Sequence, residues 1–212
     1  VRFSLLATPL TRAMAQSPFN RLELEAWSPS LEQALGTGDA YAQPLPLTDP
    51  AWFNDLGQHY SGPVVCVADA NTYSSGDLFA AGFVDNELGP LVCVGEATGA
   101  GGANVWTNID LREALHDTPH ALASPPDGVT FSLAFRRALR AGKSTGLPIE
   151  DVGVAGIPYA MTRADLLEDN RDLIATCAKL MAGVERSSMR VERRGSELLV
   201  PTAGLDEMEL YI

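Results

Sequence analysis

Two short apolar runs near the middle of the chain enclose a segment with helical periodicity. The first run, at 63–68, ends at polar and turn-forming residues, and a helical pattern follows at 75–86. Gly89 and Pro90 then precede the second run, at 91–95. Because a strand, a helix and a strand follow one another within about 35 residues, we predict a βαβ unit and a twisted, mostly parallel sheet covered by helices.

Further elements are predicted on both sides of this unit. The patterns indicate helices at 51–60 and 166–181, a strand at 129–139, and a hairpin of strands at 189–193 and 197–200 with a third strand at 209–212. We therefore divide the chain into a core, 1–182, and an appended hairpin or tail, 183–212. The appendage is either an interaction element or a packed tail.

Composition excludes several classes of protein. A net charge of −12 argues against a nucleic-acid or anionic-membrane partner. No apolar run approaches the ~20 residues of a membrane span. No signal peptide is evident, which favours a cytoplasmic location. Cys66, Cys93 and Cys177 lie in apolar patterns and are expected to be buried free thiols, and no Cys/His spacing resembles a zinc site.

Ser74 stands at the predicted strand-to-helix turn. Such a turn exposes a hydroxyl beside the free N–H groups of a helix start, the two features that acyl transfer requires. The spacing of Ser74 and Asp77 is also that of a capping box. The residues alone leave both interpretations open.

The segment 96–104 is rich in glycine. No Lys-Ser/Thr pair follows it and no dinucleotide-binding fingerprint fits it, so it is not a phosphate-binding loop. It is either mobile or closely approached by other parts of the chain.

The order of these segments resembles the C-terminal-processing, or tail-specific, serine peptidases, and more closely their tricorn-protease-like branch. Over about residues 60–182 the resemblance is carried by four segments: 71–77 (Asn-Thr-Tyr-Ser-Ser-Gly-Asp), 88–99 with its Gly-Glu-Ala-Thr-Gly end, 146–154 (Gly-Leu-Pro-Ile-Glu-Asp-Val-Gly-Val), and the helix 167–181. The resemblance implies an α/β fold of the crotonase or ClpP kind.

The resemblance also implies roles for particular residues. Ser74 matches the nucleophile and the Ser75 N–H an oxyanion donor, while Gly99, Gly101 and Gly102 match the loop that lines the substrate cleft. Glu150 matches the carboxylate that orients a His base in the tricorn-like branch. Read without the resemblance, Glu150 is a solvated turn residue.

The chain departs from the family's pattern at the general base. The loop after the second strand has no Lys, so Lys143 and Lys179 do not match a Ser–Lys dyad. His59, His116 and His120 match no catalytic His. We therefore expect the base His to come from a segment before Val1 or from a partner chain, and the chain to be a fragment, a processed chain or a truncated piece.

The sequence thus predicts a serine peptidase, or its nucleophile-bearing part, that acts on a peptide or protein substrate. It implies no metal or organic cofactor. A non-catalytic binding module and an esterase-type acyl-transfer enzyme on the same fold are the alternatives, and a homo-oligomer is compatible with the sequence.

Overall fold

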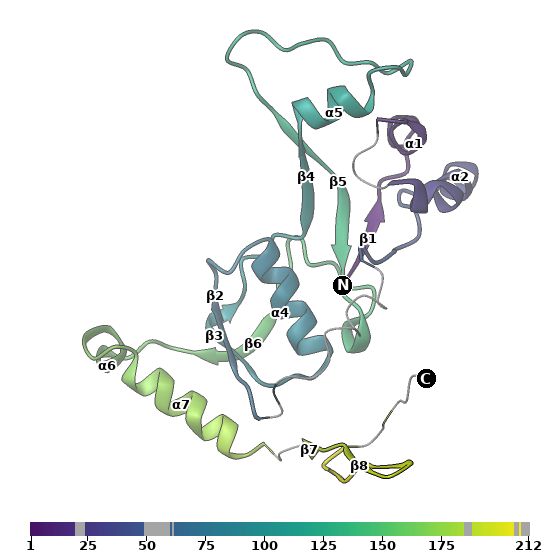
Figure 1. Ribbon diagram of the computed structural model, residues 1–212. Helices are drawn as coiled ribbons and strands as arrows, with labels where there is room; N and C mark the ends of the chain where they lie inside the picture. Colours follow the sequence, from purple (N-terminus) through teal and green to yellow (C-terminus); the bar gives the residue numbers. More distant parts are fainter. Residues whose placement is uncertain (20–23, 49–59, 61, 185–187, 206–207, 209–212) are drawn as a thin grey trace.

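The computed structural model describes residues 1–19, 24–48, 60, 62–184, 188–205 and 208. It consists of two three-stranded sheets, two short strand ladders and the helices that flank them (Figure 1). The predicted helix at 51–60, apart from Tyr60, and the predicted strand at 209–212 lie outside these residues. The elements in chain order are β1 (Arg2–Leu5), α1 (Pro9–Gln16), η1 (Leu24–Trp27), α2 (Ser28–Thr37), β2 (Cys66–Asp69), α4 (Ser75–Asp85), β3 (Leu91–Ala97), β4 (Ala103–Thr107), α5 (Asn108–Ala114), β5 (Ser132–Leu139), η2 (Gly142–Ser144), β6 (Ala155–Tyr159), α6 (Arg163–Leu167), α7 (Arg171–Ala182), β7 (Ser188–Met189), β8 (Glu192–Arg194), β9 (Glu197–Leu199) and β10 (Thr202–Ala203).

The predicted βαβ unit is confirmed. β2 and β3 pair in parallel, with Cys66 opposite Leu91, and α4 connects them. Side chains alternate along β3, so Leu91 and Cys93 join the main core with α4, whereas Val92 packs with Leu173 and Cys177 of α7. The two helices therefore cover opposite faces of this sheet.

The prediction of a mostly parallel sheet is wrong for the described strands. β6 pairs antiparallel with β3, and β5 pairs antiparallel with both β1 and β4. Of these pairs, β2 and β3 have the helical crossover that a parallel pair needs, whereas β4 and β5 are antiparallel although α5 lies in their connection. The mixture of helices and sheets still places the fold in the α/β class.

The main core lies under the sheet β1-β5-β4, where it encloses a charged side chain. Arg136 is buried, and its guanidinium lies 5.4 Å from the ring centre of Trp27 and 5.5 Å from that of Trp106. Its Nε and Nη2 donate to Asn104 Oδ1 at 3.0 and 2.7 Å. Burial lowers the pKa of Arg136. Aromatic faces and one amide oxygen thus hold this cation in place of a carboxylate.

The single helix predicted at 166–181 is divided into α6 and α7. Asp169 and Asn170 between them have positive φ angles of 51° and 61°, which ends one helix and begins the next. Asp165 joins the two halves, because its carboxylate accepts the hydroxyl of Tyr159 at 2.7 Å and the N–H of Leu173 at 2.8 Å. Burial alone raises the pKa of Asp165, but these and further hydrogen bonds lower it on balance.

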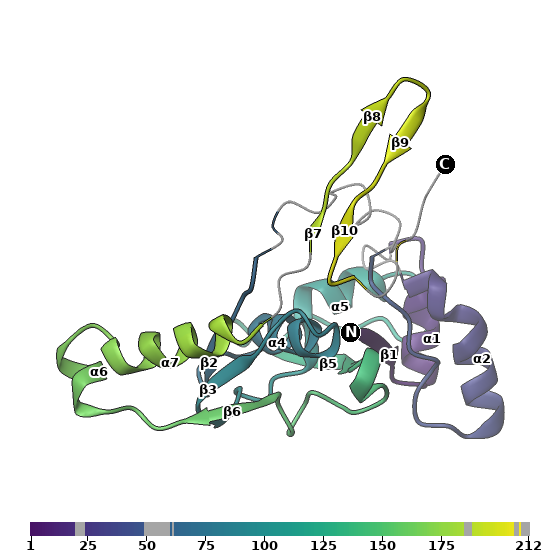
Figure 2. The same cartoon turned by 90° about the horizontal axis from the view of Figure 1, so that it is seen from below.

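The predicted C-terminal hairpin is present as two short ladders, β7 with β10 and β8 with β9. Figure 2 shows them projecting away from both sheets. All three cysteines are free thiols; Cys93 and Cys177 are buried and Cys66 is half-buried. None of the described helices is long and apolar enough to cross a bilayer.

A buried ion pair joins the end of α4 to the segment after β5. Arg140 donates through Nε and Nη2 to the two oxygens of Asp85 at 2.9 and 2.6 Å. Burial raises the pKa of Asp85, but hydrogen bonds from Arg140 and Ser144 and the Arg140 charge bring it below its ordinary value. The pair fixes the C-terminal end of α4, while its N-terminal end carries Ser74.

Replacing Arg140 by Met leaves the Asp85 charge buried without a partner. We expect R140M to lower the free energy of unfolding in urea at pH 7 by about 3–5 kcal/mol. R12M, which breaks the exposed pair of Arg12 with Glu32, is the control and should lose less than about 1 kcal/mol. Because the pKa of folded Asp85 is lowered, the loss should shrink as pH falls below about 4. Equal losses in the two variants at pH 7 would contradict the role given to this pair.

Candidate active site

A tight turn follows β2 and directs the chain into α4. The Asp69 carboxylate accepts the N–H groups of Asn71 and Thr72 at 2.9 and 3.1 Å, and the Asp69 N–H donates to Thr72 Oγ1 at 3.1 Å. Hydrogen bonds from Asn71, together with those from Thr72, lower the pKa of Asp69. The turn therefore keeps its carboxylate ionised and reverses the chain within a few residues.

Ser74 has an unusual backbone conformation at the N-cap of α4. Its φ and ψ angles are 57° and −110°, a region that residues with a side chain seldom occupy. Such strain costs on the order of 1–3 kcal/mol and tends to occur at functional sites. The Ser74 side chain is exposed and makes no capping hydrogen bond. The capping-box interpretation of Ser74 and Asp77 is therefore wrong.

Gly76 makes this sharp turn sterically feasible. A Cβ at Gly76 would lie 2.9 Å from Cγ2 of Thr72. A small residue two places after a Ser on a strained strand-to-helix turn is half of the Gly-x-Ser-x-Gly arrangement that exposes the nucleophile in many hydrolases. The sequence contained this signal in Ser74-Ser75-Gly76, but the spacing alone did not show the close approach of Thr72.

The first amide of α4 is available to a ligand. The Gly76 N–H is bonded to the Tyr73 carbonyl at 3.0 Å. Within the described part of the chain, the Ser75 N–H has no hydrogen-bond acceptor, and Ser75 is exposed. Ser75 is the first residue of an 11-residue helix, so its N–H lies at the positive end of the helix dipole, where a negative charge is stabilised.

Asp77 is the functional residue that the sequence analysis missed. Its buried carboxylate accepts the N–H of Ala100 at 3.0 Å and the N–H of Gly101 at 2.8 Å. Asp77 thus holds the glycine-rich loop against the first turn of α4. The acidic residue three places after Ser74 was visible in the sequence, but its partners, 23 and 24 positions away, were not.

The glycine-rich loop is closely approached by other parts of the chain. A Cβ at Gly99 would lie 2.5 Å from Cδ2 of Tyr73, and one at Gly101 would lie 2.6 Å from Cε1 of Tyr73 and 3.0 Å from the Ser74 nitrogen. A Cβ at Gly102 would lie 2.5 Å from the Glu150 nitrogen. These glycines are therefore required by the contacts of the loop with its neighbours.

Every N–H from Thr98 to Gly102 already has a partner inside the protein. The acceptors are the carbonyls of Val154 and Thr72 for Thr98 and Gly99, the Asp77 carboxylate for Ala100 and Gly101, and Glu150 for Gly102. The loop can shape one wall of a cleft, but none of these N–H groups is free to bind an oxyanion.

Glu150 lies on the other side of the same loop from Ser74. Its Oε2 accepts the Gly102 N–H at 2.7 Å, and the side chain is half-buried rather than solvated. The contacts of Gly101 and Gly102 place this oxygen within roughly 10 Å of the Ser74 nitrogen by standard bond lengths.

The structure places no described histidine or lysine beside Ser74. His116 and His120 lie in the segment between α5 and β5, which Figure 1 shows at the far end of the β4–β5 ribbon from α4. His59 is outside the described residues. Lys143 pairs with Glu87 just beyond the end of α4, roughly 16 Å from Ser74 by helix rise. Among the described residues, no group of His, Cys, Asp or Glu is arranged to hold a metal ion.

Comparison with known proteins shows a distant likeness of fold. No protein-family model matches the chain, and no curated protein matches it. Among solved structures, it is similar to mature CPAF, a chlamydial serine protease, in complex with lactacystin. The two chains share 17% sequence identity with a TM-score of 0.53, and the match covers 86% of this chain and 38% of that one. The likeness shows a related fold, and this chain spans well under half of the CPAF chain.

The strain at Ser74 predicts how two substitutions affect stability. Since Ser74 makes no capping bond, S74A should change the free energy of unfolding by less than about 0.5 kcal/mol. Glycine tolerates a positive φ, so S74G should be more stable than S74A by about 1 kcal/mol. S75G serves as the control, because Ser75 has helical geometry and should gain nothing from Gly. A loss of stability in S74G relative to S74A would show that the turn is not strained.

Proposed function

We propose that this chain carries the nucleophile of a serine peptidase and that Ser74 is that nucleophile. The observation that carries the proposal is the exposed side chain of Ser74 on a strained turn, next to the free N–H of Ser75. The related fold of a serine protease supports it. Within the α/β class, we assign the chain to the crotonase or ClpP kind of fold and to the tricorn-like branch of the tail-specific peptidases.

In this proposal, Ser74 Oγ attacks the carbonyl carbon of a peptide bond in a bound peptide or protein. The oxygen of the tetrahedral intermediate carries the developing charge and accepts a hydrogen bond from the Ser75 N–H. Because the N–H groups at 98–102 are engaged inside the protein, a second oxyanion donor has to come from outside the loop. Gly99, Gly101 and Gly102 contribute a close, rigid wall for the substrate.

The proton of Ser74 passes to an imidazole that lies outside the described residues. Glu150 orients this imidazole with the carboxylate oxygen that is not bonded to Gly102, and its charge stabilises the imidazolium. Lys143 is not the base, because its ammonium is paired with Glu87 at the opposite end of α4. In this proposal Glu150 therefore has two functions, since it also positions the loop.

An activity-based probe tests the assignment of the nucleophile. A fluorophosphonate should label the native protein and S75A, but not S74A, because only an activated Ser reacts. Labelling is read by intact mass and by the mass of the peptide that contains residue 74. Labelling of S74A but not of S75A would transfer the role to Ser75. A native protein that takes no label, yet binds peptides, would favour a non-catalytic binding module.

The role of Glu150 is tested by the kinetics of E150Q with a peptide substrate and its ester analogue. Gln keeps the shape and can still accept the Gly102 N–H, but it removes the charge. We expect kcat to fall by about 10²- to 10⁴-fold with little change in KM. D151N is the control, since Asp151 is the exposed neighbouring acid and should behave as wild type. An E150Q enzyme with unchanged kcat would leave Glu150 only the positioning of the loop.

A further inference from the structure

The C-terminal hairpin has one apolar face and one polar face. The pairs β7 with β10 and β8 with β9 keep the same register, and between them the Arg190 N–H donates to the Pro201 carbonyl at 3.1 Å. The two ladders therefore form one continuous antiparallel hairpin, in which successive side chains alternate between the faces and directly opposite side chains share a face. The apolar face carries Met189, Val191, Arg193, Leu198, Val200 and Thr202, and the charged side chains of the polar face are Arg190, Glu192, Arg194 and Glu197.

The core of the same chain does not cover this apolar face. Each residue at 188–205 is exposed or half-buried, and Met189, Val191 and Leu198 are 51%, 59% and 61% exposed. Figure 2 shows the hairpin projecting away from both sheets. Alternation of apolar and polar side chains is typical of a sheet with one buried face, and an isolated two-stranded hairpin is marginally stable in water. The apolar face therefore requires a partner surface.

The charge of the hairpin differs from that of the remaining chain. Residues 188–205 contain three arginines and two glutamates, a net charge of +1, so the rest of the chain contributes −13 to the total of −12. Arg193 is the charged residue of the apolar face. Its Nε donates to the Gly195 carbonyl at 3.2 Å, and no acid of the described chain forms an ion pair with it. A fitting partner surface therefore combines apolar side chains with an acid.

Such a surface lies where α6 meets α7, in a segment that we call the elbow (163–174). Its large apolar side chains are 61–73% exposed: Leu166, Leu167 and Ile174. The elbow contains four acidic and two basic side chains. The exposed Asp169 forms no ion pair within the described structure, whereas the acids on either side of it are paired with Arg171. The elbow thus offers both features that the apolar face of the hairpin requires.

The hairpin does not reach the elbow of its own chain. It follows the C-terminal end of α7, whereas the elbow lies at the N-terminal end of this 12-residue helix, about 18 Å away by helix rise. Figure 2 shows the hairpin and α6 on different sides of the molecule. Contact between the two surfaces therefore requires a second copy of the chain.

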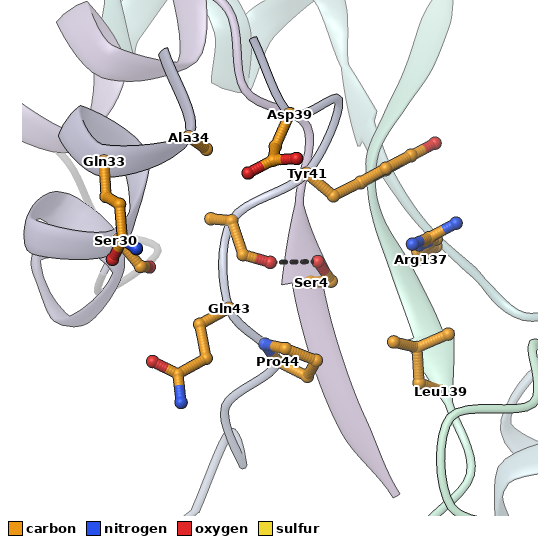
Figure 3. Close-up of a pocket in the computed structure, with 11 residues that line it drawn as sticks. Ser4, Ser30, Gln33, Ala34, Asp39, Tyr41, Gln43, Pro44, Arg137 and Leu139 are labelled. Carbon is orange, nitrogen blue, oxygen red and sulfur yellow. Dashed lines mark hydrogen bonds between the residues drawn. The ribbon is translucent and has the colours of Figure 1, made fainter. Parts of the chain in front are cut away.

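A pocket between α2 and β5 is less suited to the hairpin. It has a volume of about 390 Å³, and Figure 3 shows Asp39, Gln43 and Arg137 around it. Asp39 already accepts the hydroxyl of Thr37 at 2.6 Å, and the guanidinium of Arg137 would repel Arg193. An apolar face in this polar pocket would also remove water from polar groups without replacing their hydrogen bonds.

We propose that the apolar face of the hairpin docks on the elbow of a second copy, and that the second hairpin docks on the first elbow in the same way. Val191 and Leu198 pack against the apolar side chains of the elbow, and Arg193 pairs with the partner's Asp169. This two-fold exchange is closed and gives a dimer rather than a filament. It does not involve Ser74 or Glu150, so it is independent of the proposed function.

The dimer is expected to be weak. Each strand of the hairpin spans about 24 Å, and the two contacts together bury on the order of 1,000 Å², which is small for a specific interface. We therefore expect a Kd on the order of 10 µM.

Sedimentation equilibrium of the full chain, at concentrations on both sides of this value, tests the proposal. R193E and D169R should each raise the Kd by about 10-fold or more, because each places like charges opposite one another. The double variant with R193E and D169R exchanges the two charges and should return the Kd to within about 3-fold of the wild type. V191D, which places a charge on the apolar face, should also weaken the dimer by about 10-fold or more.

R190E is the matched control, because it makes the same change of charge on the polar face of the same hairpin. Its Kd should stay within about 3-fold of the wild type. Circular dichroism verifies that each variant is folded. The proposal is overturned if the wild type remains a monomer, if R190E weakens the dimer as much as R193E, or if V191D has no effect. Failure of the double variant to recover the dimer would overturn the assignment of the elbow as the docking site.

Discussion

The bonds from the Asp77 carboxylate to the N–H groups of Ala100 and Gly101 are the contacts on which the candidate active site depends. Asp77 is fully buried, and no described cation pairs with it. Two backbone dipoles and the nearby start of α4 therefore stabilise its charge. Removal of the Asp77 carboxylate, or of the two N–H groups that donate to it, would leave a buried polar group without a partner. The loop and the turn at Ser74 consequently form one structural unit, although Ala100 lies 23 positions after Asp77 along the chain.

The same loop links the two sheets. Gly102 donates to Glu150 and accepts the Ala138 N–H at 2.8 Å, while the Ile149 N–H donates back to the Ala138 carbonyl. A strand of one sheet, the end of β3 in the other and the turn at 146–154 thus meet within a few residues. This explains why Glu150, proposed to orient a base, is also a structural residue. The proposed orientation of a base and the observed positioning of the loop use the same carboxylate, whose two oxygens allow both.

Local sequence patterns were sufficient to predict those parts of the structure that depend on residues close together in the chain. The βαβ unit and the buried thiols follow from alternating apolar positions and turn residues; the unit is confirmed, and so is the burial of Cys93 and Cys177, whereas Cys66 is half-buried. The capping-box alternative failed because Ser74 makes no capping hydrogen bond and the Asp77 carboxylate accepts the N–H groups of Ala100 and Gly101 instead. The helix at 166–181 is interrupted because Asp165 bonds the Leu173 N–H, a contact between two turns that periodicity does not reveal. The antiparallel pairing of β5 with β1 and β4, and of β6 with β3, joins strands that are distant in the sequence or separated by long connections, so local patterns did not reveal it.

Amide hydrogen exchange in D77N tests the central claim most directly. Asn at this position keeps the volume of Asp but replaces one acceptor oxygen by a donor. If the Asp77 carboxylate holds the loop against the Ser74 turn, the Ala100 and Gly101 amides should exchange about 10- to 100-fold faster than in the wild type, while the Val92 and Cys93 amides of β3 keep their protection. Unchanged protection at both Ala100 and Gly101 would contradict the account, because the loop would then be held by something other than Asp77.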